Sequence, residues 1–237
     1  MLTNLKYFAL MLLLTPAFVS CDEVRGSGNV SKEEHDLSKF SVLEASGSMD
    51  VYITKGNTSH ATIEAEDNIL PLIELIEENG RLEVRFKRNV RINTRKQVKI
   101  FLTTAQLEAA SLSGSGDLDI QSHFETPSPV HLSLSGSGNL NASFSTPELN
   151  IDLAGSGNLK IKGETRDLKV NLAGSGDAHL DELMTETADL DIAGSGDVDL
   201  HASRTLKANI VGSGDVKYKG DPSVTVNKIG SGSVKKQ

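Results

Sequence analysis

Aliphatic side chains alternate with polar ones along much of the chain, and Gly-Ser-Gly triplets interrupt the alternation at regular intervals. Leu149, Ile151 and Leu153 precede one triplet, and Leu159 and Ile161 follow it. Alternation with a period of two is typical of β-strands that bury one face, whereas a helix would need spacings of three and four. Each unit is therefore predicted to consist of a strand, a corner, a second strand and a polar return.

The triplets recur with a period of roughly 19 residues. A pair of short strands cannot bury its apolar face alone, but units stacked in register bury a continuous aliphatic column. The predicted fold class is therefore all-β, a parallel β-helix or β-solenoid with rungs about 4.8 Å apart. A leucine-rich repeat is the alternative, but it needs a helix in return segments that do not have a helical pattern. The triplets begin at Gly114, Gly136, Gly155, Gly174, Gly194, Gly212 and Gly230, with an earlier GSGN at 26–29 and a degenerate SGSMD at 46–50.

The N-terminal half is less regular. Residues 73–78 and 81–86 alternate around Asn79-Gly80, a pair favoured in type I′ turns, which predicts a β-hairpin. A short helical turn is expected near residues 68–70, and a strand over 98–104. Because no Pro/Gly linker interrupts the sequence, we expect one solenoid domain over residues 40–237, irregular over 40–110 and repetitive over 111–237.

Composition narrows the possible functions. Aromatic residues make up 4% of the chain and tryptophan is absent, so the interior must be built of Leu, Ile, Val and Ala. The formal net charge of -8 argues against nucleic acid as the main partner.

Residues 1–20 are predicted to be a signal peptide. Lys6 supplies a positive charge, and the apolar run at 7–14 is too short to span a bilayer. Cys21 is the only cysteine, and Phe18-Val19-Ser20-Cys21 is similar to a bacterial lipobox, in which cleavage precedes a cysteine that carries diacylglycerol. Residues 21–39 are thus expected to be a lipid-anchored segment leading into the coil. The alternative is an ordinary signal peptide followed by a spectator cysteine.

The position after each triplet carries a carboxylate or an amide. Such side chains most simply accept hydrogen bonds from nearby backbone N–H groups, as in an Asx-turn. The alternative is a ladder of calcium sites, because neighbouring carboxylates about 4.8 Å apart repel one another. We favour capping and predict no metal site and no cofactor. The residues are Asp117, Asn139, Asn158, Asp177, Asp197 and Asp215.

Other candidate chemistry is weak. The six histidines (His35, His60, His123, His131, His179 and His201) are scattered without a short metal-ligand spacing. Strand carboxylates at Asp152, Asp189, Asp191 and Asp199 are expected to point outward into solvent. No catalytic residue is predicted.

A basic run from Arg81 to Lys99 contains eight Lys and Arg residues and a single Glu. One interpretation is the solvated face of the hairpin and its neighbour. The other is contact with phosphate-bearing lipid head groups or anionic glycans.

Several stretches together resemble the auto-transporter adhesin, head GIN domain family, common among exported lipoproteins of Bacteroidetes-type bacteria. They are GSGNV at 26–30, FSVLEASGSMDVYITKG at 40–56, EAEDNILPLIE at 64–74, NGRLEVRFK at 79–87 and LSGSGDLDI at 112–120 with its later copies. The resemblance implies a β-helical fold and an adhesion-like role at the cell surface or in the periplasm. It brings no catalytic residues with it.

We therefore predict an exported, membrane-anchored lipoprotein of the cell envelope, at the outer membrane or cell surface or in the periplasm. It would be non-enzymatic and adhesin-like, binding a glycan or a protein. The alternatives are a glycan-acting enzyme, which would need two carboxylates about 5–9.5 Å apart in a cleft, and a purely structural envelope component. A homodimer through the solenoid ends is also expected, because only lysines and Pro222 protect the last strand edge.

Overall fold

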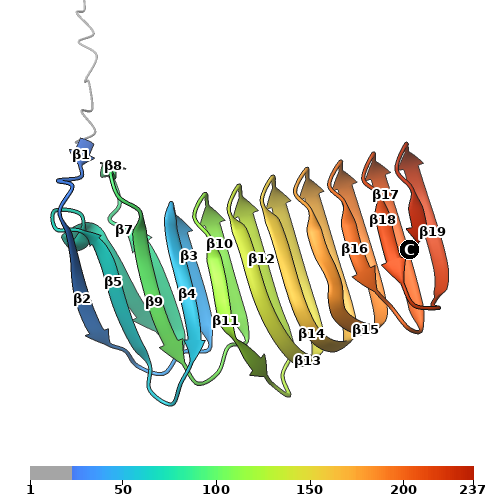
Figure 1. The fold of residues 1–237 in the computed structure, drawn as a ribbon, viewed down its shortest axis with the longest axis horizontal. Helices are drawn as coiled ribbons and strands as arrows, with labels where there is room; N and C mark the ends of the chain where they lie inside the picture. Colours follow the sequence, from blue (N-terminus) through green and yellow to red (C-terminus); the bar gives the residue numbers. More distant parts are fainter. Residues whose placement is uncertain (1–22) are drawn as a thin grey trace, which may run out of the picture.

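A parallel β-solenoid of stacked two-strand rungs is seen in the computed structural model, which describes residues 23–237 (Figure 1). The predicted fold class is confirmed. The predicted signal peptide and Cys21 lie outside the described residues. Within the described part, no helix is long and apolar enough to cross a membrane.

Each rung contributes one strand to each of two layers, which meet at the Gly-Ser-Gly corner. Consecutive rungs pair in parallel in both layers. The first layer, before the corners, contains β3 (Val42–Gly47), β10 (Ala109–Gly114), β12 (Val130–Gly136), β17 (Thr205–Gly212) and β19 (Ser223–Gly230). The second layer, after the corners, contains β4 (Met49–Lys55), β11 (Leu118–Glu125), β16 (Val198–His201), β18 (Val216–Lys219) and β20 (Val234–Lys236). Three long strands supply both layers: β13 (Asn139–Gly155), β14 (Asn158–Gly174) and β15 (Ala178–Gly194).

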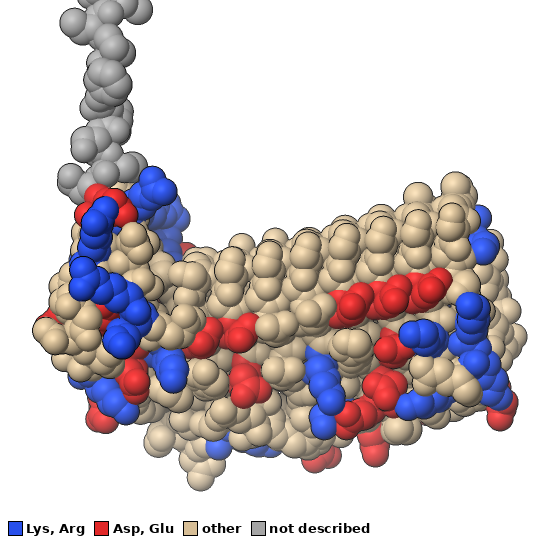
Figure 2. All heavy atoms as spheres, turned by 45° about the horizontal axis from the view of Figure 1, so that its top comes forward, with Lys and Arg blue, Asp and Glu red and all other residues tan. Residues whose placement is uncertain are grey.

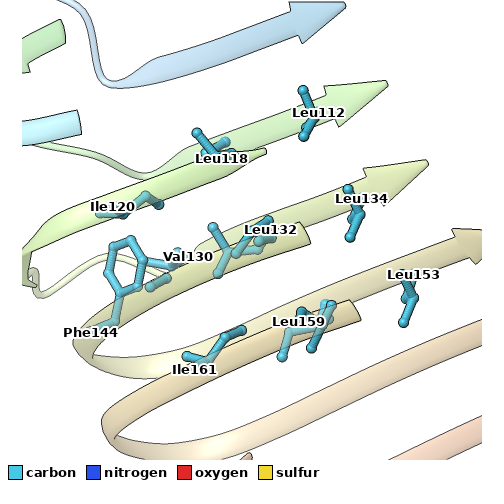
Figure 3. Close-up of a cluster of buried hydrophobic side chains, with 14 of the residues drawn as sticks. Leu112, Leu118, Ile120, Val130, Leu132, Leu134, Phe144, Leu153, Leu159 and Ile161 are labelled. Carbon is cyan, nitrogen blue, oxygen red and sulfur yellow. The ribbon is translucent and has the colours of Figure 1, made fainter. Parts of the chain in front are cut away.

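The core lies between the layers and consists of aliphatic columns (Figure 3). In one column the parallel register places Leu134, Leu153, Leu172, Ile192 and Ile210 on successive rungs. All five side chains are buried. Strand side chains alternate between faces, so a slip of one residue would point every side chain of such a column toward the solvent. The cost of exposing these side chains fixes the register.

The two glycines of a corner are needed for different reasons. Gly174 has a φ of 132°, which L side chains rarely adopt, and a Cβ there would lie 2.2 Å from the Gly155 carbonyl oxygen. Gly176 has no positive φ, but its Cβ would lie 1.9 Å from the Gly157 oxygen. The first glycine therefore supplies left-handed backbone, and the second permits close stacking of the rungs.

The first rung shows why the degenerate corner at 46–50 is tolerated. Gly47 pairs with Gly114 and keeps the positive φ. Met49 occupies the place of the second glycine, directly beneath Gly116. Its neighbour on the other side is Val98, in a straight strand, so no corner backbone crowds the methionine side chain. Met49 is fully buried and fills the start of the core.

Buried threonines occupy the turn at the opposite side of the rung from the glycine corner. The Thr104 hydroxyl lies 2.6 Å from the Phe40 carbonyl oxygen, and the Thr146 hydroxyl lies 2.8 Å from that of Ser128. The hydroxyls of Thr104, Thr146 and Thr165 also each lie 3.1 Å from the carbonyl oxygen two residues later. Thr146, Thr165 and Thr185 pair on successive rungs. The hydroxyls thus bond to carbonyl oxygens of the turn. On the rung of Thr165 the turn also contains Gly163, which has a φ of 115°.

Additional strands close the N-terminal end of the solenoid. The predicted hairpin is confirmed as β6 (Ile73–Glu78) and β7 (Arg81–Phe86), with positive φ at Asn79 and Gly80. The expected strand at 98–104 is β9 (Val98–Thr104), and the helical turn is a 3-10 helix, η1, at Leu70–Leu72. The remaining strands are β1 (Glu23–Arg25), β2 (Val30–Asp36), β5 (His60–Glu66) and β8 (Arg91–Asn93).

The C-terminal end is open. Strand β19 is exposed along its whole length, including Val224, Val226 and Ile229. Lys228 lies in the inward column above Ile210, and its ammonium group donates to the Gly232 oxygen. An inward lysine on an edge strand hinders indiscriminate strand pairing.

Candidate functional site

A ladder of carboxylates and amides runs along the glycine corners (Figure 2). The Asp177 Oδ1 accepts a hydrogen bond from the Asp197 backbone N–H at 2.9 Å, and the Asp197 Oδ1 accepts one from Asp215 at 2.8 Å. Asp117 and Asn158 bind the next rung in the same way. The acceptor role is as predicted, but the donor belongs to the following rung, so the expected local Asx-turn is wrong.

This ladder explains the Asp and Asn residues without a cation. One oxygen of each side chain except Asn139 is engaged by a backbone N–H group, and the Asn139 Oδ1 accepts from the side-chain amide of Asn158. At the end of the row, Asp215 accepts from both the backbone N–H and the hydroxyl of Ser233, at 2.8 Å each. The Ser233 hydroxyl and backbone N–H hold the pKa of Asp215 below its ordinary value.

We expect neither calcium nor EDTA to change the melting temperature by more than about one degree. The reason is that the corner carboxylates stabilise the stack through backbone hydrogen bonds and not through a bound ion. Thermal unfolding followed by circular dichroism, with and without each additive, measures this. A calcium-dependent rise of many degrees would contradict the assignment.

The outer face of the first layer carries a column of interlocked amides and carboxylates. The Asn171 amide donates to Asp152 Oδ1 at 2.8 Å, and the Asn209 amide donates to Asp191 Oδ1 at 2.7 Å. The Asn227 amide continues the column by donating to Asn209 Oδ1 at 3.0 Å. The column thus presents hydrogen-bonding groups at the spacing of the rungs.

An apolar column runs beside these amides, next to the glycine corners. It contains Ala154, Ala173, Ala193, Val211 and Ile229, which occupy the same position on successive rungs. The last two are 57% and 74% exposed. Between the two columns lies a shallow groove of about 290 Å³, whose lining includes Asn171, Ala173, Asp191, Ala193, Asn209 and Val211. We call it the amide groove.

The outer face of the second layer is built of ion pairs. Lys160 and Lys162 lie 3.0 Å and 2.8 Å from the two oxygens of Glu182. Their ammonium groups, that of Lys162 most strongly, lower the pKa of Glu182 to about 2. A hollow of about 460 Å³ beside these lysines is lined mainly by polar side chains such as Asn141 and Ser143. Glu182 and Asp119, which also lines the hollow, together balance the charges of the two lysines, so this hollow has little to attract an anion.

The four strand carboxylates named from the sequence lie on the outer faces, as predicted, and each has a partner. Asp152 lies 3.2 Å from His131, Asp189 lies 3.1 Å from Lys207, and Asp199 lies 3.4 Å from His179. His123 contacts serine hydroxyls on the next rung. Across residues 23–237, no group of three or more His, Cys, Asp or Glu side chains could hold a metal ion.

A buried carboxylate organises the N-terminal end. Glu66 is fully buried, and its oxygens accept hydrogen bonds from the backbone N–H groups of Gly28 at 2.7 Å and Arg95 at 2.9 Å. A Cβ on Gly26 would lie 2.0 Å from this carboxylate. The GSGN sequence at 26–29, which was counted among the triplets, is therefore not a corner of the solenoid. It is a loop that wraps Glu66.

Burial alone would raise the pKa of Glu66, but hydrogen bonds from the backbone N–H groups of Arg95, Gly28 and Lys96 outweigh it and lower the pKa. A carboxyl group with a lowered pKa in the folded state stabilises the fold fully above its ordinary pKa. The stabilisation is lost as the pH falls through the lowered value.

We expect Glu66→Gln to lower the melting temperature by several degrees at pH 7, because an amide NH₂ group would face a backbone donor. The difference from the wild type should shrink as the pH falls and the wild-type carboxylate takes up a proton. Thermal melts over a pH series test this, with the exposed Glu78→Gln as control. A difference that stays constant down to pH 2 would contradict the role given to the charge.

Three features were not found from the sequence. The threonine turns had a detectable signal, since Thr-x-x-Leu recurs at 104–107, 146–149 and 165–168. The amide groove had a weaker one, because Ala, Val or Ile replaces Ser before the glycines from residue 154 onward. Glu66 had none, because it lies 38 residues from Gly28 in the sequence.

Known proteins share this architecture. The model of a family described as "Putative auto-transporter adhesin, head GIN domain" matches residues 39–222. A "putative lipid binding protein" from Parabacteroides distasonis is 25% identical, with a TM-score of 0.76, and covers 91% of this chain and 100% of its own. A "putative adhesin" from Bacteroides fragilis is 23% identical, with a TM-score of 0.83, over 90% of this chain and 100% of its own. No curated protein matches the chain.

Proposed function

The chain belongs to the auto-transporter adhesin, head GIN domain family, and from this premise we propose that it is a non-enzymatic binding module of the cell envelope that uses the amide groove. The family description is that of an adhesin-like protein, which points to an exported or surface location. The amide groove is the observation that carries the proposal. It combines evenly spaced hydrogen-bonding groups with an apolar floor, which suits a repetitive glycan or an extended polypeptide.

The partners of the outer carboxylates also favour binding over hydrolysis. A glycosidase needs one carboxyl group free to act as an acid and a second as base or nucleophile. Here Asp152, Asp189 and Asp199 contact histidine or lysine side chains, and Asp191 accepts an amide hydrogen bond. Such pairing suits a static surface.

Binding of the purified chain to an array of glycans and extracellular-matrix proteins tests this function. We expect Asn171→Ala combined with Asn209→Ala to weaken binding at least tenfold, because both amides border the groove. The matched control is Asn141→Ala with Ser143→Ala on the opposite layer, which should bind like the wild type. Equal loss in both variants, or shortening of a bound glycan, would contradict the proposal.

We further propose that Cys21 carries the lipid that holds the protein at a membrane. Support comes from the lipobox-like residues 18–21 and from the absence of any other cysteine in the chain. The description of the Parabacteroides distasonis relative as a lipid binding protein is compatible with an envelope role. Mass spectrometry of the membrane-extracted protein should find diacylglycerol on Cys21, and an unmodified cysteine would refute this point.

Association of two copies through the open C-terminal rung also remains a proposal. Exposed Val224 and Val226 and the unpaired edge of β19 support it, whereas the inward Lys228 opposes it. Sedimentation velocity over a range of concentrations would reveal a dimer, and Val226→Lys should abolish it. A monomer at all concentrations would rule out this association.

A further inference from the structure

Exposed cations gather at the N-terminal end of an otherwise acidic molecule. We call Arg25, Lys87, Arg88, Arg91, Arg95 and Lys96 the basic N-terminal surface; all six residues are exposed. Figure 2 shows this group of Lys and Arg side chains at the end of the solenoid where the described chain begins. The net charge of the chain is -8, so this positive surface has the opposite sign to the molecule as a whole.

The structure divides the basic run 81–99 into two parts. In the hairpin, Arg81 pairs with Glu44 at 3.1 Å, and Arg85 pairs with Glu74 at 3.0 Å and Glu83 at 2.9 Å. Beyond the hairpin, none of the five cations from Lys87 to Lys96 forms an ion pair with a residue that the structure describes. A solvated hairpin face therefore accounts for the first part of the run but not for the second.

The unpaired cations lie where the N-terminal segment enters the fold. Strand β1 pairs in parallel with β8, which places Glu23 opposite Arg91 and Arg25 opposite Asn93. Cys21 is two residues before Glu23, a distance that extended chain covers in at most about 7 Å. A lipid on Cys21 would thus bring the basic N-terminal surface to the level of the lipid head groups.

Hydrogen bonds hold the backbone of the segments that carry Arg25, Arg95 and Lys96. Glu66 accepts from the backbone N–H groups of Arg95 and Lys96, and the Asn68 amide donates to the Arg25 carbonyl oxygen at 2.7 Å. The Gly26 N–H donates to the Asn93 oxygen at 2.9 Å. The loop backbone is therefore arranged before any ligand arrives, which lowers the entropic cost of binding.

We propose that the basic N-terminal surface binds the phosphate head groups of anionic lipids in the leaflet that holds the anchor. Lys and Arg side chains near a membrane surface are attracted to its anionic head groups by charge, whichever of the two residues carries it. The contact would fix the N-terminal end against the membrane and leave the amide groove free for its partner. The inference rests on the proposed envelope function.

Vesicle sedimentation tests the proposal with residues 22–237, which include every residue that the structure describes and carry no lipid. We expect binding to an equimolar mixture of phosphatidylglycerol and phosphatidylcholine at low salt, and none to phosphatidylcholine alone. Arg88→Gln, Arg91→Gln and Arg95→Gln together should weaken binding on the order of a hundredfold, at about fivefold for each cation. Replacing the same residues with lysine should largely preserve it.

The matched control removes the same charge elsewhere. The control variant combines Lys207→Gln, Lys217→Gln and Lys235→Gln, at exposed positions on the last rungs. It should change binding by less than about threefold. Failure of the wild type to bind the mixed vesicles, equal binding to phosphatidylcholine alone, or an equal loss in the control would each overturn the proposal. None of these results affects the array assay, so the two proposals fail separately.

Discussion

Gly174→Ala is expected to destabilise the solenoid by more than about 4 kcal/mol. A left-handed φ costs a non-glycine residue about 1–2 kcal/mol, and Gly174 has a φ of 132°. The larger part comes from the contact with the rung before. The new Cβ would lie 2.2 Å from the Gly155 oxygen and 3.0 Å from its amide nitrogen, and backbone atoms cannot move aside without separating the rungs.

Two further variants separate these causes. Gly80→Ala has a similar φ problem, at 78°, but no atom lies within 4 Å of its Cβ, so it should cost only about 1–2 kcal/mol. Gly176→Ala has the close contact without the positive φ, and should be nearly as damaging as Gly174→Ala. Urea unfolding followed by circular dichroism measures all three. If Gly176→Ala proves as mild as Gly80→Ala, close stacking of the corners is not what requires the second glycine.

Phe144→Ala is expected to cost about 3–5 kcal/mol, the usual range for removal of a buried phenylalanine. Phe144 is fully buried, and its ring centroid lies 5.9 Å from that of Phe124 on the preceding rung. On the following rung, Gly163 occupies the same position and has no side chain to move into the space. The cavity would therefore persist, and chemical denaturation should show the full loss.

Val226→Ala on the open rung is the matched comparison. Val226 occupies an inward column but is 41% exposed, because none of the described residues forms a rung over it. Its truncation should cost at most about 1 kcal/mol. Stability in a solenoid is close to a sum of rung and interface contributions, so similar losses at Phe144 and Val226 would contradict the structure.

Much of the fold could be predicted because the information is local. The alternation of Leu149, Ile151 and Leu153 specifies a strand with one buried face. The glycine triplets specify where the chain turns. The prediction was incomplete at the threonine turns, which have no repeated glycine triplet and in which buried hydroxyls bond to turn carbonyls. The prediction was wrong for the GSGN at 26–29. Its sequence matches a corner, but the segment packs against the Glu66 carboxylate and not against another corner.

The amino-acid sequence by itself determined that the rungs stack and in what register, because a period of two and a fixed repeat length leave one way to bury the aliphatic columns. Only the tertiary structure decided which polar groups meet. The partners of Asp177 and Asp197 are about one rung away in sequence, and that of Glu66 is reached only through the path of a loop. The same holds for the basic run. Strand β7 meets acidic partners on both neighbours, Glu44 on β3 for Arg81 and Glu74 on β6 for Arg85. Arg88, Arg91 and Arg95 are left facing solvent beside the start of the described chain.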